Sequence, residues 1–315
     1  MNAIVCTLFE GHYHYGVAAL ANSLYNRGFR GVLYVGYRGS VPFWAEQAVE
    51  NPALGWPGSQ SFSPSQGLDI HFLPLETTWH LTNYKPEFML RIFNNYGSGA
   101  DAILYFDPDI VVKCQWEFYL NWVSYGVALV HEITSNDMPY SHPIRMEWLK
   151  LIDRCNLQPQ RKLQSYINGG FCGVSRRDLG FLDIWSLILK TGFSYYQFDP
   201  SKFMPTNREH PFYGTDQDAL NMTAMCSEFP LSEIGPEGMD FVYGGYTMSH
   251  AVGSPKPWKK NYIWSALQGN SPSLPDKCFW QNVQGPIATY HSWHIQRKQV
   301  GLTIASAIGR FYRRA

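Results

Sequence analysis

The chain has 315 residues, enough to bury the core of one large domain or of two modest ones. Its 25 basic and 25 acidic residues cancel, which argues against a nucleic-acid-binding protein, because such a protein needs a basic face to neutralise phosphates. Aromatic residues make up 16% of the chain, a surplus that can stack on ring-shaped ligands but is more often packed in a core.

The first half of the chain reads as alternating strands and helices. Val17, Leu20 and Leu24 recur at helical spacing between two apolar runs, which predicts a strand, an amphipathic helix ending near Gly28 and a second strand. This order predicts a parallel sheet, and the Pro-, Gly- and Ser-rich stretch 51–67 predicts a long surface loop. The elements expected in this half are strands at 3–9, 31–37, 68–75 and 102–106 and helices at 15–28 and 85–97.

The second half continues the same pattern with more irregular sequence. We expect strands at 127–131 and 167–176, a helix at 179–192, and a helix that begins at Thr215 as its N-cap. The polar stretch 134–165 is expected to be irregular around a short helix and is a candidate for the specificity-determining part.

No leader or anchor is expected. The N-terminus lacks a basic region followed by an apolar one, and no stretch approaches ~18 uninterrupted apolar residues. The six cysteines are scattered without a Cys-x-x-Cys pair, which is typical of reduced thiols in a cytosolic protein. We therefore expect a cytoplasmic protein.

Two acids, Asp107 and Asp109, follow the apolar strand predicted at 102–106. Side chains two apart in an extended segment point the same way, so both carboxylates can face one point. Ligands collect beyond the carboxyl ends of the strands of a parallel sheet, and paired carboxylates suit Mg²⁺ or Mn²⁺ with a bound diphosphate. A solvated or helix-capping acidic turn is the alternative, because a D-x-D pair alone is a weak signal.

The stretch HAVGSPKPW, residues 250–258, combines three groups that suit an anion. His250 offers an imidazole nitrogen, Gly253 permits close approach of backbone, and Lys256 supplies a positive charge. Each of these residues taken singly is more often structural, so the combination carries the prediction.

Two further segments hold polar groups near glycines or at a helix start. In YINGGFCG, Asn168 stands beside paired glycines, which suits a close approach to a ligand or only a bulge. In GTDQDALN, Asp216 and Asp218 flank Gln217, and simple capping is the alternative because acids in a first helical turn complement the macrodipole.

Together these four segments resemble glycosyltransferase family 8, whose members are retaining enzymes of the GT-A fold and include glycogenin and the galactosyltransferases of bacterial lipo-oligosaccharide. The resemblance reaches from residue 3 to about 260, with only a general likeness at 40–80 and 134–165. It implies an α/β, Rossmann-like, mostly parallel mixed sheet flanked by helices. The matching motifs, in family order, are Asp107/Asp109, Asn168-Gly169-Gly170, Asp216-Gln217-Asp218-Ala219-Leu220-Asn221 and residues 250–258.

The resemblance implies a metal and diphosphate site. Asp107, Asp109 and His250 would bind Mn²⁺ (or Mg²⁺), which would bridge both phosphates of a nucleotide-sugar, usually a UDP-sugar. Gly253 and Lys256 would hold the diphosphate.

The resemblance also implies contacts to the base and to the transferred sugar. Tyr13 would lie over the uracil, and Thr7, taken as the end of the first strand, would meet the base. Asn168, Asp216 and Gln217 match residues that contact the sugar, with Gln217 nearest the reacting face.

The family places one more basic residue on the helix before the D-x-D strand. Lys85 and Arg91 both qualify, and spacing does not decide between them. We prefer Lys85 because it begins the helix.

The implied activity is a retaining, metal-dependent transfer of a hexose from a nucleotide-sugar to a glycan, glycolipid or other hydroxyl acceptor. A divalent ion and Lys256 would stabilise the charge on the leaving diphosphate, while oxygens of Asp216 and Gln217 would lie near the developing sugar cation. An amide is a poor nucleophile, which favours front-face attack over double displacement. Bacterial surface-glycan synthesis is the expected setting.

Two other functions compete with this interpretation. A sugar-phosphate nucleotidyltransferase uses a similar metal-diphosphate site, but the stretch TLFEGHYHYG after the first strand has no Lys or Arg. A non-catalytic nucleotide-sugar-binding protein is the other alternative. His291 or His294 in YHSWHIQRK could also supply the metal's histidine, although that stretch lacks the Gly and Lys that phosphates need.

We divide the chain into a catalytic domain at 1–265 and a basic, aromatic extension at 266–315. The end of the extension is either an amphipathic helix on anionic lipid or a helix docked on the domain with a solvated basic end. After Asp276 the chain has no acid and these bases: Lys277, Arg297, Lys298, Arg310, Arg313 and Arg314.

Overall fold

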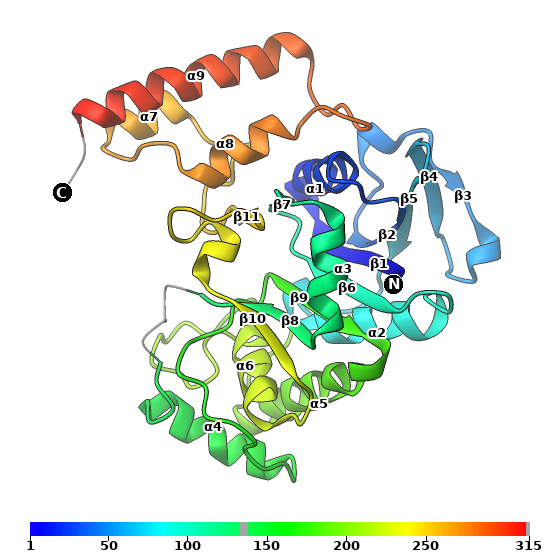
Figure 1. Cartoon of the computed structure of the whole chain (residues 1–315), viewed down its shortest axis with the longest axis vertical. Coiled ribbons are helices and arrows are strands. Elements are labelled where there is room, and N and C mark those ends of the chain that lie inside the picture. The colour runs from blue at the N-terminus through cyan, green and yellow to red at the C-terminus, as the bar shows by residue number, and fades with distance from the viewer. Residues whose placement is uncertain (133–137, 313–315) are drawn as a thin grey trace.

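The structure is a computed structural model that describes residues 1–132 and 138–312. Its centre is a nine-stranded sheet in the order β10-β8-β9-β6-β1-β2-β5-β4-β3, beside a two-stranded sheet of β7 and β11 (Figure 1). The strands are β1 (Ala3–Glu10), β2 (Gly31–Arg38), β3 (Val49–Glu50), β4 (Gln60–Ser65), β5 (Leu68–Pro74), β6 (Ala102–Phe106), β7 (Ile110–Val112), β8 (Val127–Val130), β9 (Phe171–Ser175), β10 (Leu231–Ile234) and β11 (Met248–His250).

The large sheet is mostly parallel, as the sequence predicts. Strand β1 pairs in parallel with β2 and β6, and β2 does so with β5, whereas β9 and β4 run against their neighbours. The helices are α1 (His14–Asn26), α2 (Lys85–Asn95), α3 (Trp116–Ser124), α4 (Pro143–Arg154), α5 (Gly180–Tyr195), α6 (Asp216–Cys226), α7 (Tyr262–Leu267), α8 (Leu274–Gln281) and α9 (Ser292–Phe311).

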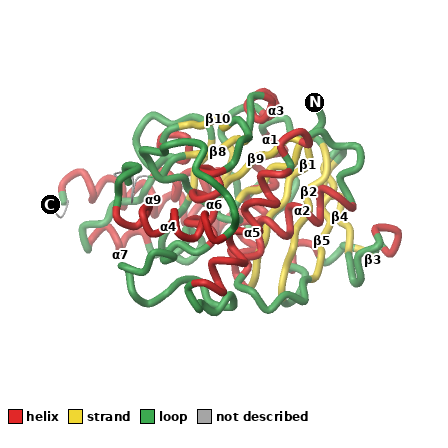
Figure 2. The backbone as a smooth tube through the Cα atoms, turned by 90° about the horizontal axis from the view of Figure 1, so that it is seen from below, coloured by secondary structure: helices red, strands yellow, loops and turns green. Residues whose placement is uncertain are grey.

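Helices cover both faces of the sheet because the buried strands are apolar on both sides. Along β1, Cys6 and Leu8 pack into the core that contains residues of α2, α4, α5 and α6. Val5 and Phe9, on the opposite face of the strand, pack with residues of α1 and α3. The layers are visible when the molecule is seen from below (Figure 2).

A third core joins the C-terminal helices to the rest of the chain. Buried residues of α7, α8 and α9 pack together with Trp258, with Ala19 on α1 and with Val111 on β7. The boundary expected at residue 265 therefore falls inside α7, which packs against α9.

Two local expectations differ from the structure. The predicted loop 51–67 contains the strand β4, which pairs antiparallel with β5; it lies near the edge of the sheet, where Pro64 and polar residues are tolerated. Thr215 occupies the N-cap position of α6 but does not cap it, because its hydroxyl donates to the Phe203 carbonyl at 3.1 Å.

Two further observations concern the cysteines and the length of the apolar helices. All six cysteines are free thiols. Within the two described ranges, no helix is both long enough and apolar enough to cross a bilayer.

Candidate active site

Asp107 and Asp109 lie in the turn that joins β6 to β7, at the carboxyl end of the central parallel strands. The Asp107 amide donates to the Gly170 carbonyl at 2.7 Å, and the Ile110 amide donates to the Asp107 carbonyl at 3.0 Å. Helix α1 touches this turn so closely that a Cβ on Gly16 would lie 2.0 Å from the Pro108 carbonyl oxygen. The turn is thus fixed by backbone contacts from two sides.

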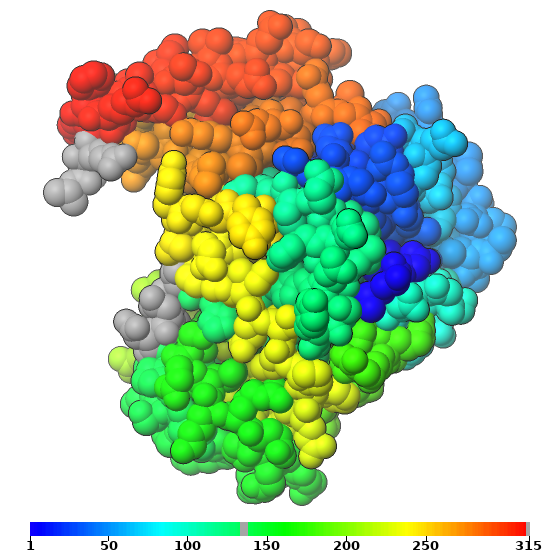
Figure 3. Space-filling view, viewed as in Figure 1, coloured from blue at the N-terminus to red at the C-terminus, as the bar shows by residue number. Residues whose placement is uncertain are grey.

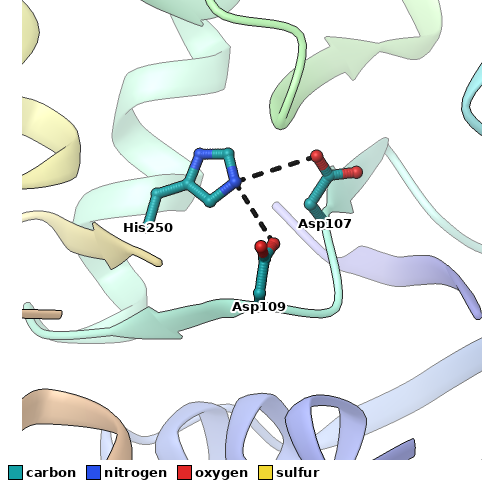
Figure 4. A group of neighbouring side chains, drawn as sticks. All are labelled: Asp107, Asp109 and His250. Atoms are coloured by element: carbon teal, nitrogen blue, oxygen red, sulfur yellow. Dashed lines mark ion pairs between the residues drawn. The ribbon is translucent and has the colours of Figure 1, made fainter. Parts of the chain in front are cut away.

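His250 reaches the two acids because β11 pairs antiparallel with β7, with His250 opposite Ile110. Its Nε2 lies 3.2 Å from Asp109 Oδ1 and 3.9 Å from Asp107 Oδ2 (Figure 4). The ring is buried, and a Cβ on Gly170 would lie 2.4 Å from its Cε1. A glycine at 170 therefore makes room for the imidazole.

These three side chains fit a divalent cation. One ligand atom from each residue lies within 4.8 Å of the others, and no second group of this kind occurs in the described parts of the chain. Imidazole nitrogen with carboxylate oxygens is a donor set that Mn²⁺ accepts. The fit to a divalent cation depends on His250 Nε2, which faces both Asp107 and Asp109.

Lys256 lies on the other side of Asp109. Its Nζ donates to Asp109 Oδ2 and, at 2.9 Å, to the Ala251 carbonyl. Burial raises the pKa of the Asp109 carboxyl, but the charges of His250 and Lys256 outweigh burial and hold it well below its usual range. Asp109 is therefore an anion, and the Lys256 ammonium lies beside it.

Lys85 is the second buried cation of the site. Its Nζ lies 3.1 Å from Asp107 Oδ1, 3.0 Å from Asp216 Oδ2 and 2.9 Å from the Gly169 carbonyl oxygen. Burial lowers the pKa of Lys85, but the charges of the two acids outweigh burial, so the pKa lies above its ordinary value. Arg91 instead stacks on the Trp56 ring, with its guanidinium carbon 3.4 Å from the ring centroid.

Asp216 and Gln217 begin α6 and face the Asn168-Gly169-Gly170 segment. Gln217 Oε1 accepts from the Gly169 amide at 2.7 Å, and Asn168 Oδ1 accepts from the Gly170 amide at 2.8 Å. Burial raises the pKa of Asp216 to about 6, although Lys85 beside it lowers it. These contacts fix the segment against the start of α6.

The cavity at this site has a volume of about 550 Å³ and is open to solvent on one side. It is lined by all but one of the predicted site residues: Tyr13, Lys85, Asp107, Asp109, Asn168, Asp216, Gln217, His250, Gly253 and Lys256. Gly253 has φ +80°, a left-handed conformation that favours glycine, and a Cβ there would meet no atom within 4 Å.

Thr7 is the exception. It is fully buried in the middle of β1 and does not line the cavity, because β1 continues to Glu10. Leu8, Phe9 and Glu10 reach the cavity instead. The alternative histidines lie elsewhere: His291 precedes α9, and His294 stacks on Tyr290 at 5.0 Å between ring centroids.

Several cavity residues carry no motif that sequence reasoning could use. Glu132, after β8, accepts from Asn168 Nδ2 at 2.5 Å, and the Tyr105 hydroxyl donates to Asp107 Oδ1 at 2.8 Å. A loop between α5 and α6 supplies a further wall: Phe203, Met204, Arg208, His210 and Tyr213. Only Tyr105 left a signal in the sequence. It is a tyrosine with a polar hydroxyl in an otherwise apolar strand, two residues before Asp107.

No family model matches the sequence, and no curated protein matches it either. Solved structures do match in fold. The apo structure of the WbbM bifunctional glycosyltransferase has a TM-score of 0.56 and 16% identity, and the match covers 95% of this chain and 52% of that one. The glycosyltransferase GlyE of Streptococcus pneumoniae TIGR4 has a TM-score of 0.53 and 13% identity, covering 96% and 64%.

The chain has a glycosyltransferase fold of GT-A type. It spans about half to two thirds of the length of these two glycosyltransferases. At such identities the likeness extends to the fold alone, so the chemistry has to be argued from the side chains in the cavity.

Proposed function

We propose that the protein is a retaining, metal-dependent glycosyltransferase of the family 8 type that moves a hexose from a nucleotide-sugar, namely a UDP-sugar, to a hydroxyl acceptor. The observation that carries this proposal is the grouping of Asp107, Asp109 and His250 in a cavity at the carboxyl end of the central strands. Lys256 beside Asp109 supports it, because it supplies the charge that a diphosphate needs.

Asp107, Asp109 and His250 would hold Mn²⁺ or Mg²⁺, which when bound would neutralise negative charge on the leaving diphosphate. Lys256 would exchange its contact with Asp109 for a phosphate oxygen, and Gly253 would let the diphosphate approach the backbone. Lysine contacts of this kind act most strongly on charge that grows as the bond breaks.

The base and sugar would lie along the lining residues of the same cavity. Tyr13 offers an aromatic face at its wall, and the Lys256 Nζ lies 5.7 Å from the centroid of that ring. Asp216 and Gln217 would turn oxygens towards the sugar, with Lys85 holding Asp216 in place. Gln217 is already engaged by the Gly169 amide, and an amide is a weak nucleophile, so we favour front-face attack.

The acceptor would be a glycan, a glycolipid or another hydroxyl compound, and the wall formed by residues 203–213 is the surface open to it. Free thiols suit a cytoplasmic site of action, because disulfides are rare there. A binder that does not catalyse, or a nucleotidyltransferase, would use the same metal site, and product analysis separates the three.

The test is incubation of the purified chain with a panel of UDP-sugars and Mn²⁺. We expect release of UDP, and a loss of at least about 100-fold in Asp109→Asn, because the substitution removes a charged ligand next to the reacting phosphates. Asp153→Asn, an exposed acid on α4, is the matched control and should keep full activity.

Pyrophosphate release would instead identify a nucleotidyltransferase, and tight donor binding without any release would identify a binder. Once an acceptor is known, the anomeric configuration of the product, read by proton NMR, tests retention directly. An inverted anomer would overturn the family 8 part of the proposal.

A further inference from the structure

Helix α9 has two apolar faces, and only one of them is used by the fold. Ile295, Leu302 and Ala305 point inward and are buried in the third core. The outward face carries a second apolar row, whose exposed fractions are Trp293 62%, Val300 58%, Ile304 44% and Phe311 92%.

The outward row lies on one side of the helix. At about 100° per residue, these four positions fall within about 40° of one another. An ordinary surface helix is polar on the side away from its core, so this stripe is unexplained by folding. We call the four residues the α9 stripe.

Charged residues flank the α9 stripe on both sides. Arg297 lies about 20° beyond one edge of the stripe, and Arg310 lies about 80° beyond the other edge, at the groove between α8 and α9; both are exposed. The chain carries no acid after Asp276, so the surface near the stripe is basic. Arg313 and Arg314, which belong to the expected basic end, lie outside the described residues.

A groove of about 450 Å³ runs between α8 and α9 next to this face. Lys277 on α8 and Arg310 on α9 line it together with the apolar groups of Trp280, Leu302 and Ala307. Within the described chain, neither Lys277 nor Arg310 makes an ion pair. The rest of the lining is polar (Gln281, Gln299, Thr303 and Ser306), and two cations beside hydroxyl and amide groups suit a phosphate headgroup.

We propose that the α9 stripe and this groove form a docking surface for a membrane that contains anionic lipid. Apolar side chains, two of them large aromatics, would enter the headgroup boundary, and the flanking bases would meet lipid phosphates. Exposed apolar residues on the neighbouring α7, namely Ile263, Trp264 and Leu267, would add contact area.

The charge argues for lipid rather than for a second copy of the chain. A symmetric pair would bring the same basic surface of both copies together, and the described stretch 277–312 has no acid to meet Arg297 and Arg310. The C-terminal segment lies along the top edge of the molecule with its outer side uncovered, as docking on a flat surface requires (Figure 3).

This inference rests on the proposed function for one point only. If the protein is a glycosyltransferase, docking would place it at a lipid-linked acceptor. Vesicle binding itself can be measured without any turnover. Release of UDP from a UDP-sugar in solution can be measured without vesicles, so the two proposals can fail separately.

The experiment is flotation of the full chain with vesicles of phosphatidylcholine alone or mixed with phosphatidylglycerol. We expect binding to the anionic vesicles, and a partition coefficient at least about tenfold lower when the stripe is made polar, because several apolar side chains lose their burial together. The stripe variant combines Trp293→Ser, Val300→Ser, Ile304→Ser and Phe311→Ser.

A matched control makes the same kind of change at exposed apolar positions far along the chain, Val49→Ser and Tyr125→Ser, and should bind like the wild type. A second variant, Lys277→Gln with Arg310→Gln, should weaken binding to anionic vesicles only. Thermal unfolding checks that each variant is folded. If the stripe variant does not fold, the variant Lys277→Gln with Arg310→Gln still tests the proposal.

Three outcomes would overturn the proposal. The wild type could fail to bind anionic vesicles, or the stripe and charge variants could bind as well as the wild type. Light scattering could also find a stable dimer that the stripe substitutions break, which would make a second copy the occupant.

Discussion

Ile110 and His250 are partners in the antiparallel ladder of β7 and β11, and this pairing brings the imidazole of His250 against Asp109. The two strands are separated by more than a hundred residues of sequence, yet each is only three residues long. Strand β7 is held to α1 as well, since the Val112 amide donates to the Ser23 hydroxyl at 2.9 Å. The candidate metal site is therefore built on backbone pairing.

We predict that His250→Ala weakens Mn²⁺ binding while the fold survives. The substitution removes the nitrogen ligand and leaves two carboxylates on one side of the site. Loss of one ligand should weaken affinity by at least about tenfold, which titration calorimetry with Mn²⁺ alone would measure. His294→Ala, on the C-terminal extension, is the control, and an equal loss there would contradict the assignment of His250.

We predict that Lys85→Met destabilises the protein strongly. Lys85 is buried between Asp107 and Asp216, so its removal leaves two acids in an apolar setting without their cation. The expected loss is about 3–5 kcal/mol in the free energy of unfolding, measured by urea denaturation at pH 7.

Arg91→Met is the comparison for Lys85→Met because it removes a cation from the same helix. Arg91 makes a stacking contact with Trp56 at the surface, so the expected cost is about 1 kcal/mol or less. Equal losses in the two variants would contradict the difference that the structure assigns to them.

We predict that Gly16→Ala distorts the turn that carries the two acids. The added Cβ would lie 2.0 Å from the Pro108 carbonyl oxygen, and backbone has to move to relieve that overlap. We expect a loss of about 2 kcal/mol or more in stability together with weaker Mn²⁺ binding. Gly301→Ala on α9, where a Cβ meets nothing within 4 Å, should instead be neutral or stabilise by about 0.5–1 kcal/mol.

We predict that stability falls as pH rises from about 4 to about 7, in part because of Asp218. Burial raises the pKa of Asp218 to about 7 from 3.8, although the Tyr166 hydroxyl that donates to it lowers it. The folded protein then holds a proton that the unfolded chain has released, so the free energy of unfolding decreases through this window by up to about 4 kcal/mol.

The pH prediction is checked by urea denaturation at pH 5 and pH 7.5 in the wild type and in Asp218→Asn, both without metal. The variant cannot lose this proton, so its stability should change less between the two pH values. Asp109, whose pKa is lowered, contributes stability that is lost only at still lower pH and does not interfere. A parallel change in both proteins would exclude Asp218 as the cause.

Much of the fold was predictable because the periodicity of apolar residues indicates buried strands and amphipathic helices. Helix α1 and strands β1, β2 and β6 occur where the apolar pattern puts them. Strands β7 and β11 were not predicted, since three residues are too few to show alternation. Their pairing depends on tertiary contacts that local sequence does not encode.

The candidate site was predictable where residues stand in recognisable motifs. Asp107, Asp109 and His250 come together as the resemblance implies. Thr7 was misplaced because it was taken as the end of a strand that already continues past it in the predicted range 3–9; in the structure β1 ends at Glu10, which pairs with Arg38 of β2 through backbone register and through an ion pair at 2.8 Å. The wall at residues 203–213 was missed because an irregular loop leaves no periodic signal.

The third hydrophobic core has a practical consequence for anyone who shortens this chain. Trp258, from the loop that carries Gly253 and Lys256, is buried against the C-terminal helices, and its indole Nε1 donates to His12 next to Tyr13. A fragment that stopped at residue 265 would strip the cover from Trp258 and leave the loop of Gly253 and Lys256 without its support. Within the described chain, the helices after residue 265 thus support the side of the cavity that Gly253 and Lys256 line, and a truncated chain would lose that support.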